Sequence, residues 1–318
     1  MPTYLAVLYI FGGVIWLLMG GDVLVRGAIA LSRKANVSPL IVGLTVVAFG
    51  TSAPEFVVSL RAALTGYPDL AIGNIVGSNI ANILLVIALP AIIYPMTCDQ
   101  TGARRDSRIM LGVSLVFAAL CALGPLDRRK GLVLLLMLGL FLLHAFRASG
   151  LDKSWEEESQ GWERVLGLPR TSAMIGAFVV LGIVALPLGA DLLVRGAVGI
   201  AQTLGVSSAV IGLTVVAVGT SLPELATTLV AALKREPALA VGNVVGSNVM
   251  NIVAIMGVTA SVSPTPIPIP EGFLTLDLPV MLLAAAILTW IVNRSGVIGP
   301  RLGVMLLLGY LVYTVALF

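Results

Sequence analysis

Two glutamates stand in otherwise apolar stretches of the sequence, each directly after a proline: Glu55 in VAFGTSAPEF, residues 47–56, and Glu224 in VAVGTSLPEL, residues 216–225. Proline removes a backbone N–H donor and clashes with the preceding helical turn, so we expect a helix to bend or open at each motif. Opening a helix frees carbonyl oxygens, which are costly in an apolar environment unless a partner satisfies them. A carboxylate beside freed carbonyls predicts a cation site.

The oxygen atoms at these motifs indicate which cation would bind. If the two motifs face each other, both carboxylates converge, and neighbouring hydroxyls and carbonyls add further oxygens from Thr51, Ser52, Thr220 and Ser221. Calcium takes six to eight hard oxygen ligands in a forgiving geometry, and sodium accepts a smaller set of the same kind. The soft ligands of copper and structural zinc sites are absent from both motifs. The pattern favours calcium and sodium.

A second repeated element, GNxxGSNxxN, follows each glutamate motif, at residues 73–82 and 242–251. In each copy a serine and an asparagine lie four residues apart on one helix face: Ser78 with Asn82, and Ser247 with Asn251. Their uncharged oxygens would complete a cation site without adding charge. The alternative interpretation is that the small residues allow close helix packing while the amides hydrogen-bond between helices. The repetition beside two glutamates favours the cation site.

The elements that must position these residues are membrane-spanning helices. Of 318 residues, 58% are hydrophobic and only 11% are charged, far from the balance of a soluble protein. Apolar stretches of the length that crosses a bilayer recur along the chain, and no cleaved signal peptide is recognisable. We predict ten spans, at residues 4–31, 38–65, 69–94, 107–126, 129–147, 171–203, 206–233, 237–261, 275–292 and 298–317.

The sequence contains an internal duplication. An offset of 169 residues, as from Asp22 to Asp191, superposes residues 20–82 on residues 189–251 without a gap, with about half of the positions identical. Five predicted spans per copy is an odd number, so the second copy must cross the bilayer in the opposite sense. Inverted repeats are a recurrent transporter architecture, with the substrate near the bilayer midplane on interrupted helices.

We therefore predict an all-α polytopic membrane protein with ten transmembrane helices in two inverted five-helix repeats and broken helices at the central site. The repeats comprise residues 1–147 and 171–318, and the polar residues 148–170 form a cytoplasmic linker. Thirteen of the 19 Lys and Arg residues fall on the linker side and four on the other, which places both termini outside the cytoplasm. The net charge of +3 is thus a topology signal, and we predict no nucleic-acid partner.

Three further features are interpreted as structural. Asp22 with Arg26, and Asp191 with Arg195, are spaced as self-neutralising helical ion pairs. The two cysteines, Cys98 and Cys121, are predicted on a loop and inside a span, so we expect no disulfide between them.

In these motifs the chain resembles the cation/calcium exchanger superfamily, specifically its sodium/calcium exchanger branch. GTSAPE and GTSLPE, each followed by GNxxGSN, are similar to the two alpha repeats of that family, and the match extends over nearly the whole chain. The resemblance implies ten transmembrane helices in two inverted halves, exchange of calcium for sodium by alternating access, and sliding of the first and sixth helices across the core. It implies a transporter and no enzyme, with calcium and sodium as transported ions, no cofactor, and a plasma (inner) membrane location.

Carried over by position, the resemblance also implies a set of ligands. Calcium would be held by Glu55, Glu224 and the backbone carbonyls of Thr51 and Thr220. Sodium would be held by the same glutamates together with Ser52, Ser221, Ser78, Ser247 and the carbonyls of Ala48 and Ala217, with Asn82 and Asn251 supporting the site. Some family members carry aspartate where this chain has Asn251. Because asparagine is uncharged, we expect less dependence of transport on protons or potassium at this position.

Three alternatives to sodium/calcium exchange are open. Protons could replace sodium if both glutamates are protonated during transport. A passive cation channel could also use paired acidic residues, although a duplication within one chain is not the symmetry of a pore between subunits. A membrane scaffold would tolerate loss of both carboxylates. We also expect one chain to be sufficient for transport, because both motifs lie in it.

Overall fold

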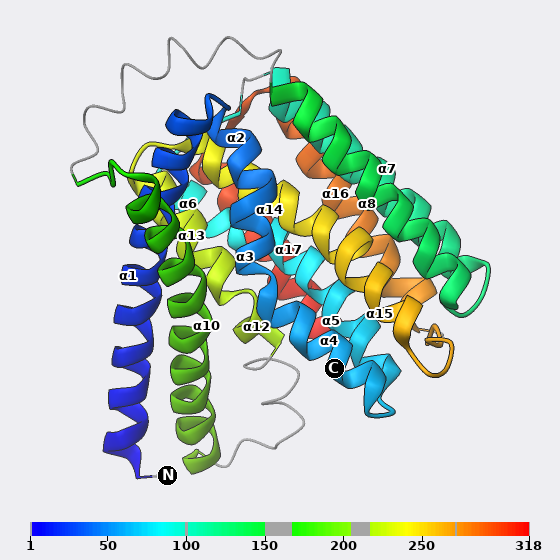
Figure 1. Ribbon diagram of the computed structural model, residues 1–318. Helices are drawn as coiled ribbons and strands as arrows, with labels where there is room; N and C mark the ends of the chain where they lie inside the picture. Colours follow the sequence, from blue (N-terminus) through cyan, green and yellow to red (C-terminus); the bar gives the residue numbers. More distant parts are fainter. Residues whose placement is uncertain (1, 99–100, 150–166, 205–216, 271, 318) are drawn as a thin grey trace.

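The computed structural model describes residues 2–98, 101–149, 167–204, 217–270 and 272–317. In the described residues the regular structure is helical apart from two short strands (Figure 1). The first repeat contains α1 (Thr3–Ala35), α2 (Pro39–Val42), η1 (Gly43–Val47), α3 (Ala48–Thr51), α4 (Ala53–Leu64), α5 (Pro68–Ala81), η2 (Asn82–Val86), α6 (Ala88–Ile93), α7 (Thr101–Ala122) and α8 (Arg128–Ser149).

The second repeat contains α10 (Ser172–Thr203), α12 (Ala217–Thr220), α13 (Leu222–Leu233), α14 (Pro237–Met250), η5 (Asn251–Met256), α15 (Gly257–Val262), η6 (Phe273–Asp277), α16 (Leu278–Arg294) and α17 (Pro300–Ala316). The elements from α12 to α15 follow the order of those from α3 to α6, and η6 is an additional element. Each of the ten predicted spans contains helix. The first half of the span predicted at 206–233 and most of the linker predicted at 148–170 lie outside the described residues.

The described helices are those of a polytopic membrane protein. Six are long and apolar enough to cross a bilayer, and the bent pair Pro39–Thr51 and Ala53–Leu64 makes a seventh. The other predicted spans fall short of that criterion for local reasons. α7 begins with the charged sequence ARRDSR, α17 has 17 residues, and α13 is described without the residues that precede α12.

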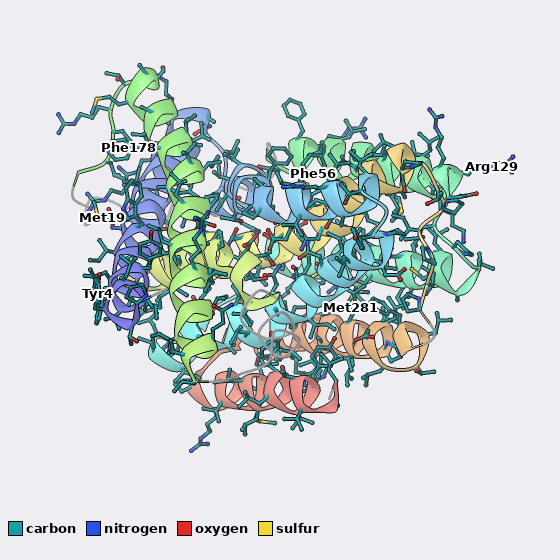
Figure 2. The ribbon with its side chains drawn as sticks, turned by 90° about the horizontal axis from the view of Figure 1, so that it is seen from below. Tyr4, Met19, Phe56, Arg129, Phe178 and Met281 are labelled. Carbon is teal, nitrogen blue, oxygen red and sulfur yellow. The ribbon has the colours of Figure 1, made fainter. Side chains whose placement is uncertain are left out.

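Apolar side chains in this protein lie at the surface as well as in the core. All residues of the second GNxxGSNxxN element, Gly242–Asn251, are buried within the helical stretch Pro237–Val262. Large apolar side chains instead cover the periphery, as on α1, where Tyr4 is 70% and Met19 is 63% exposed and both point outward in Figure 2. Such a surface is stable only against lipid. Buried polar residues thus lie within an apolar core, and further apolar side chains face outward.

α1 and α10 pack side by side and form a pair at one edge of the molecule (Figure 1). Glycines allow this close approach: a Cβ on Gly13 would lie 2.5 Å from the backbone nitrogen of Leu193, and one on Gly189 would lie 2.8 Å from that of Leu17. The two glycines are not at equivalent positions of the repeats, yet each contacts backbone of the other helix. The two helices therefore pack closely, with direct backbone-to-backbone contacts at their interface.

Short backbone pairings join loops of the two repeats. β1 (Met96–Thr97) pairs antiparallel with β2 (Val297–Ile298), and Met96 lies opposite Ile298. Leu126 and Ile267 exchange two backbone hydrogen bonds of 2.8 and 2.9 Å. Both cysteines are buried free thiols, as expected, and burial raises the pKa of Cys98, in the loop before α7, to about 12.

Candidate cation site

The structure confirms that a helix is interrupted at each glutamate motif. In the first copy α3 ends at Thr51, α4 begins at Ala53, and the two helical stretches that meet there are bent by 47°. In the second copy α12 ends at Thr220 and α13 begins at Leu222. Pro54 and Pro223 occupy the first turns of α4 and α13, where a missing N–H donor is tolerated. The prolines therefore start new helices and do not kink existing ones.

Both glutamates lie in the first turn that follows the break, and both are fully buried. The N-terminal end of a helix carries partial positive charge, which favours a carboxylate there. Among the described residues no Lys, Arg or His forms an ion pair with either side chain. Glu55 and Glu224 are thus buried carboxylates without a cationic partner among the described residues, an arrangement that is unfavourable unless a mobile cation completes it.

The two breaks meet in space. Ser52 Oγ, at the first break, donates a 2.8 Å hydrogen bond to Oε1 of Glu224, which lies 172 residues away at the second break. The equivalent bond in the other direction is absent: Ser221 Oγ and both carboxylate oxygens of Glu55 are buried without a hydrogen-bond partner. The two halves of the site are therefore related by the duplication but are not identical in their hydrogen bonding.

Most of the buried side-chain oxygens without hydrogen-bond partners lie on residues that the sequence predicted: Glu55, Glu224, Ser78, Ser221, Ser247, Asn82 and Asn251. In the described part of the chain, Thr227 and Thr259, which were not predicted, carry the others. Buried polar groups are almost always paired in native proteins, so a concentration of unpaired oxygens requires an explanation. A cation that accepts several oxygen ligands satisfies them together. The donor set is hard oxygen throughout, which suits sodium or calcium and does not suit a thiophilic metal.

Four predicted backbone ligands lie at the ends of the two short helices. Ala48 and Ala217 are the first residues of α3 and α12, and Thr51 and Thr220 are the last. The carbonyl oxygen of Ala48 accepts a 3.0 Å hydrogen bond from the backbone nitrogen of Ser52. The single hydroxyl proton of Thr51 faces both this carbonyl, at 3.3 Å, and Asn243 Oδ1, at 3.2 Å, so donation to Asn243 leaves one lone pair of the Ala48 oxygen available for sodium.

Asn82 and Asn251 lie at a feature that the sequence analysis missed. Each is the first residue of a π-helical segment, η2 and η5, at equivalent positions of the two repeats. Such segments widen a helix locally and recur at functional sites. The amide of Asn251 donates a 3.1 Å hydrogen bond to Asn79, whereas neither polar atom of the Asn82 amide has a partner. No simple residue signal marks a π-helical turn, and only the repetition of the asparagines indicated these positions.

Each GNxxGSNxxN element contains two further asparagines to which the sequence assigns no role, and the first of them is Asn74 in one repeat and Asn243 in the other. Asn74 and Asn243 each hydrogen-bond the backbone of the glutamate in their own repeat and a threonine of the other repeat. Their partners Ser59 and Thr228 also occupy equivalent positions. Two features of the sequence could have identified Asn74 and Asn243: the asparagine is repeated in both copies, and a hydroxyl residue is repeated four residues after each glutamate.

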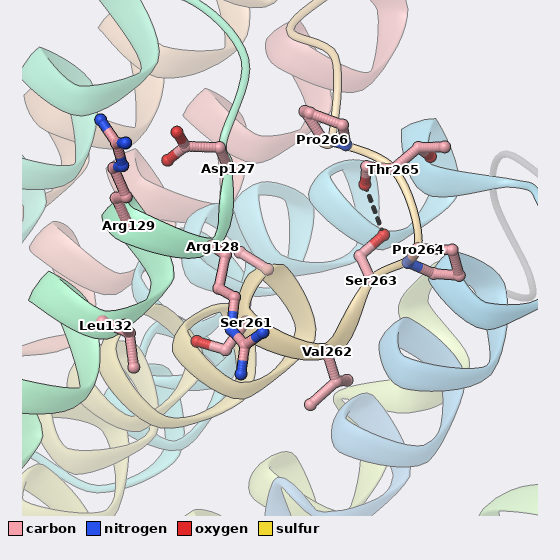
Figure 3. A pocket seen from close by; sticks show the side chains of 11 residues that line it. Asp127, Arg128, Arg129, Leu132, Ser261, Val262, Ser263, Pro264, Thr265 and Pro266 are labelled. Atoms are coloured by element: carbon pink, nitrogen blue, oxygen red, sulfur yellow. Dashed lines mark hydrogen bonds between the residues drawn. The ribbon is translucent and has the colours of Figure 1, made fainter.

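A solvent-accessible pocket of about 670 Å³ lies elsewhere, between the start of α8 and the loop after α15 (Figure 3). Asp127, Arg128, Arg129 and several hydroxyl and proline side chains line it, and no residue of the glutamate motifs does. In the described parts of the chain, no three His, Cys, Asp or Glu side chains are grouped as a metal cluster would require. The two-carboxylate, oxygen-lined centre between the broken helices is the candidate cation site.

Comparison with known proteins agrees with this geometry. The family model described as sodium/calcium exchanger protein matches residues 5–147 and 174–318. Inner membrane protein YrbG of Escherichia coli (strain K12) is 37% identical over 99% of this chain and 97% of its own length. Sodium/calcium exchanger MaX1 of Methanosarcina acetivorans is 31% identical over 96% of both chains. The sodium-calcium exchanger NCX_Mj, soaked with 2.5 mM Na⁺ and 0.1 mM Ca²⁺, superposes with a TM-score of 0.83 over 99% of both chains at 31% identity.

Proposed function

Because the chain belongs to the sodium/calcium exchanger family and is a transporter rather than an enzyme, we propose that it is a secondary-active antiporter that exchanges calcium for sodium by alternating access. The observation that carries this proposal is the pair of fully buried glutamates at two interrupted helices, surrounded by unpaired oxygens. Names of relatives support it: MaX1 is a sodium/calcium exchanger, and NCX_Mj was soaked with sodium and calcium.

The proposed ligands follow the sequence expectations. Calcium is held by the carboxylates of Glu55 and Glu224 and by the carbonyls of Thr51 and Thr220. Sodium ions occupy the same centre with the glutamates and with oxygens of Ala48, Ser52, Ser78, Ala217, Ser221 and Ser247, while Asn82 and Asn251 support both. Either load neutralises two carboxylates that otherwise stay uncompensated in a medium where an ionised side chain is costly. The empty site is therefore disfavoured during the conformational change, which couples the two ion flows.

The proposed architecture has ten transmembrane helices in two inverted five-helix repeats, residues 1–147 and 171–318, joined by the linker 148–170. Equivalent order of elements and equivalent hydrogen bonds around the site support it. The protein is an integral membrane protein, and the similarity to an inner membrane protein supports the bacterial plasma membrane. We place both termini outside the cytoplasm on the Lys and Arg distribution. All site residues come from one chain, so a monomer is sufficient for transport.

Purified protein reconstituted in sodium-loaded liposomes tests the function. Calcium-45 uptake is expected after dilution into sodium-free buffer and not when sodium is equal on both sides, because the outward sodium gradient is the driving force. Uptake driven by a proton gradient without sodium would instead assign the protein to proton/calcium exchange. Uptake without any gradient would indicate a channel, and no transport in any condition would reject calcium as the substrate.

An ion pair between the α1/α10 pair and the core predicts an effect on access. Asp22 on α1 contacts Arg26 of its own helix at 2.6 Å, as expected, but it also contacts Lys234, just after α13, at 2.6 Å. If α1 and α10 slide across the core during transport, this cross-helix contact is made in one state and broken in another. Lys234→Ala is expected to change the ratio of apparent calcium affinities at the two membrane faces by about two- to fivefold, the range for a partly exposed ion pair.

The affinities are measured as the calcium concentration for half-maximal uptake in vesicles of each orientation. Arg195→Ala is the matched control, since Arg195 pairs with Asp191 within α10 and both side chains are more exposed. An equal change of affinity at both faces in Lys234→Ala, or the same change in Arg195→Ala, contradicts the role assigned to the Asp22–Lys234 contact.

A further inference from the structure

Two crossed asparagines connect the broken helices of the two repeats. Asn74 Nδ2, on α5, donates to the backbone carbonyl of Glu55 at 3.3 Å and to Ser59 Oγ at 2.9 Å. The carbonyl oxygen of the same amide accepts a 3.5 Å hydrogen bond from Thr220 Oγ1 of the other repeat. Asn74 thus bonds its own glutamate segment with its NH₂ group and the opposite break with its carbonyl.

Asn243, on α14, repeats the arrangement in the opposite direction. Its Nδ2 donates to the carbonyl of Glu224 at 3.3 Å and to Thr228 Oγ at 3.0 Å, and its Oδ1 accepts a 3.2 Å bond from Thr51 Oγ1. The amide orientation is determined by chemistry, because the backbone carbonyl of a glutamate accepts and never donates. The NH₂ group must face that carbonyl, so the oxygen must face the threonine.

The threonines are the last residues of the short helices before each break, and the glutamates lie in the first turn after it. Each asparagine therefore links the segment after one break to the segment before the other. Two such links in opposite directions join the two glutamate segments. This matters because two like charges repel, and no cationic side chain of the described residues pairs with Glu55.

We propose that Asn74 and Asn243 are positioning residues that hold the two halves of the site at the separation calcium requires; this rests on the function proposed above. A divalent ion shared by two carboxylates and two threonine carbonyls needs ligands from both repeats at once, whereas monovalent sodium requires a smaller oxygen set at each position. Loss of a cross-repeat link therefore weakens calcium binding more than sodium binding. The asparagines thus contribute to cation selectivity without being ligands.

The test compares Asn74→Ala and Asn243→Ala with Asn248→Ala as control. Asn248 is a buried asparagine of α14 whose amide donates to the carbonyl of Val244 in its own helix. Each positioning variant is expected to raise the KM for calcium by about tenfold, the effect of losing a coupled buried hydrogen bond, with the uptake rate at saturating calcium and the KM for sodium changed by less than about threefold. Asn248→Ala is expected to leave all three unchanged.

Crossed double-mutant cycles exclude a general loss of packing. Thr220→Val and Thr51→Val remove each hydroxyl donor at nearly constant side-chain volume. Asn74→Ala is expected to be non-additive with Thr220→Val and additive with Thr51→Val, and Asn243→Ala is expected to show the reverse. Additive effects in the Asn74/Thr220 and Asn243/Thr51 cycles, or calcium and sodium KM values that rise together, overturn the proposal.

The same double-mutant cycles are also carried out with the melting temperature of the cation-free protein as the measured quantity, because this measurement does not depend on transport. Wild-type protein that takes up no calcium would reject the proposed function while leaving the crossed coupling measurable. If Asn74→Ala does not fold, Thr220→Val alone, which removes the hydroxyl that donates to Asn74, is expected to raise the KM for calcium more than the KM for sodium. If the wild-type protein exchanges calcium for sodium but the crossed coupling is missing, only the positioning role proposed for the asparagines is rejected.

Discussion

Glu55→Gln is expected to abolish calcium uptake and, at the same time, to stabilise the cation-free protein. Removing one partner of a buried charge interaction costs about 3–5 kcal/mol, which corresponds to a loss of at least about a hundredfold in calcium binding. Without a cation the effect reverses, because Glu55 is fully buried and neither of its carboxylate oxygens has a hydrogen-bond partner. Calcium-45 uptake and thermal unfolding with and without calcium measure both effects.

Asp69→Asn is the matched control, since Asp69 is an exposed carboxylate in the first turn of α5. It is expected to change neither uptake nor the calcium-dependent rise in melting temperature. Glu224→Gln is expected to stop transport in the same way but to stabilise the cation-free protein less, because Ser52 already donates to Glu224. A Glu55→Gln protein that retains calcium-dependent stabilisation would show that the central site does not bind calcium through this carboxylate.

Gly246→Ala is expected to prevent correct folding or to destabilise the protein by about 3 kcal/mol or more, at the upper end of over-packing effects. An added Cβ would lie 2.5 Å from the carbonyl oxygen and 2.7 Å from the Cα of Leu44 in η1, and 2.8 Å from the Cβ of Ala48. These are mostly backbone atoms that no rotamer change can remove. α14 would have to move away from the segment that carries Thr51 and Ser52.

The yield of monodisperse protein and its melting temperature measure this effect, with Gly139→Ala in α8 as the control. No described atom lies within 4 Å of a Cβ on Gly139, so alanine there is expected to be neutral or to stabilise the helix by up to about 1 kcal/mol. Wild-type yield and melting temperature for Gly246→Ala would mean that α14 packs less closely on η1 than the structure shows.

The sequence alone predicted the features that depend on composition and local pattern. Apolar stretches identified a helical membrane protein, the 169-residue offset identified the duplication, and proline beside glutamate identified the interrupted helices. These predictions are confirmed. The length of a span and the effect of a proline depend only on residues that are neighbours in the sequence, and a duplication can be read from the alignment of the two copies. The membrane orientation and the ligand roles stay predictions, and the sodium/calcium assignment is a proposal.

Tertiary structure decided which of these residues meet. Asp22 was expected to pair only with Arg26, four residues away, but the packing of α1 against α13 also brings Lys234 to it. Ser52 bonds Glu224 and not Glu55, which is three residues away, and Thr51 bonds Asn243 of the opposite repeat. An apolar helix in a membrane has no hydrophobic stripe that fixes its rotation, since lipid and neighbouring helices are equally apolar. The hydrogen-bond partners across the site therefore depend on close packing at glycines such as Gly246, which sequence periodicity does not encode.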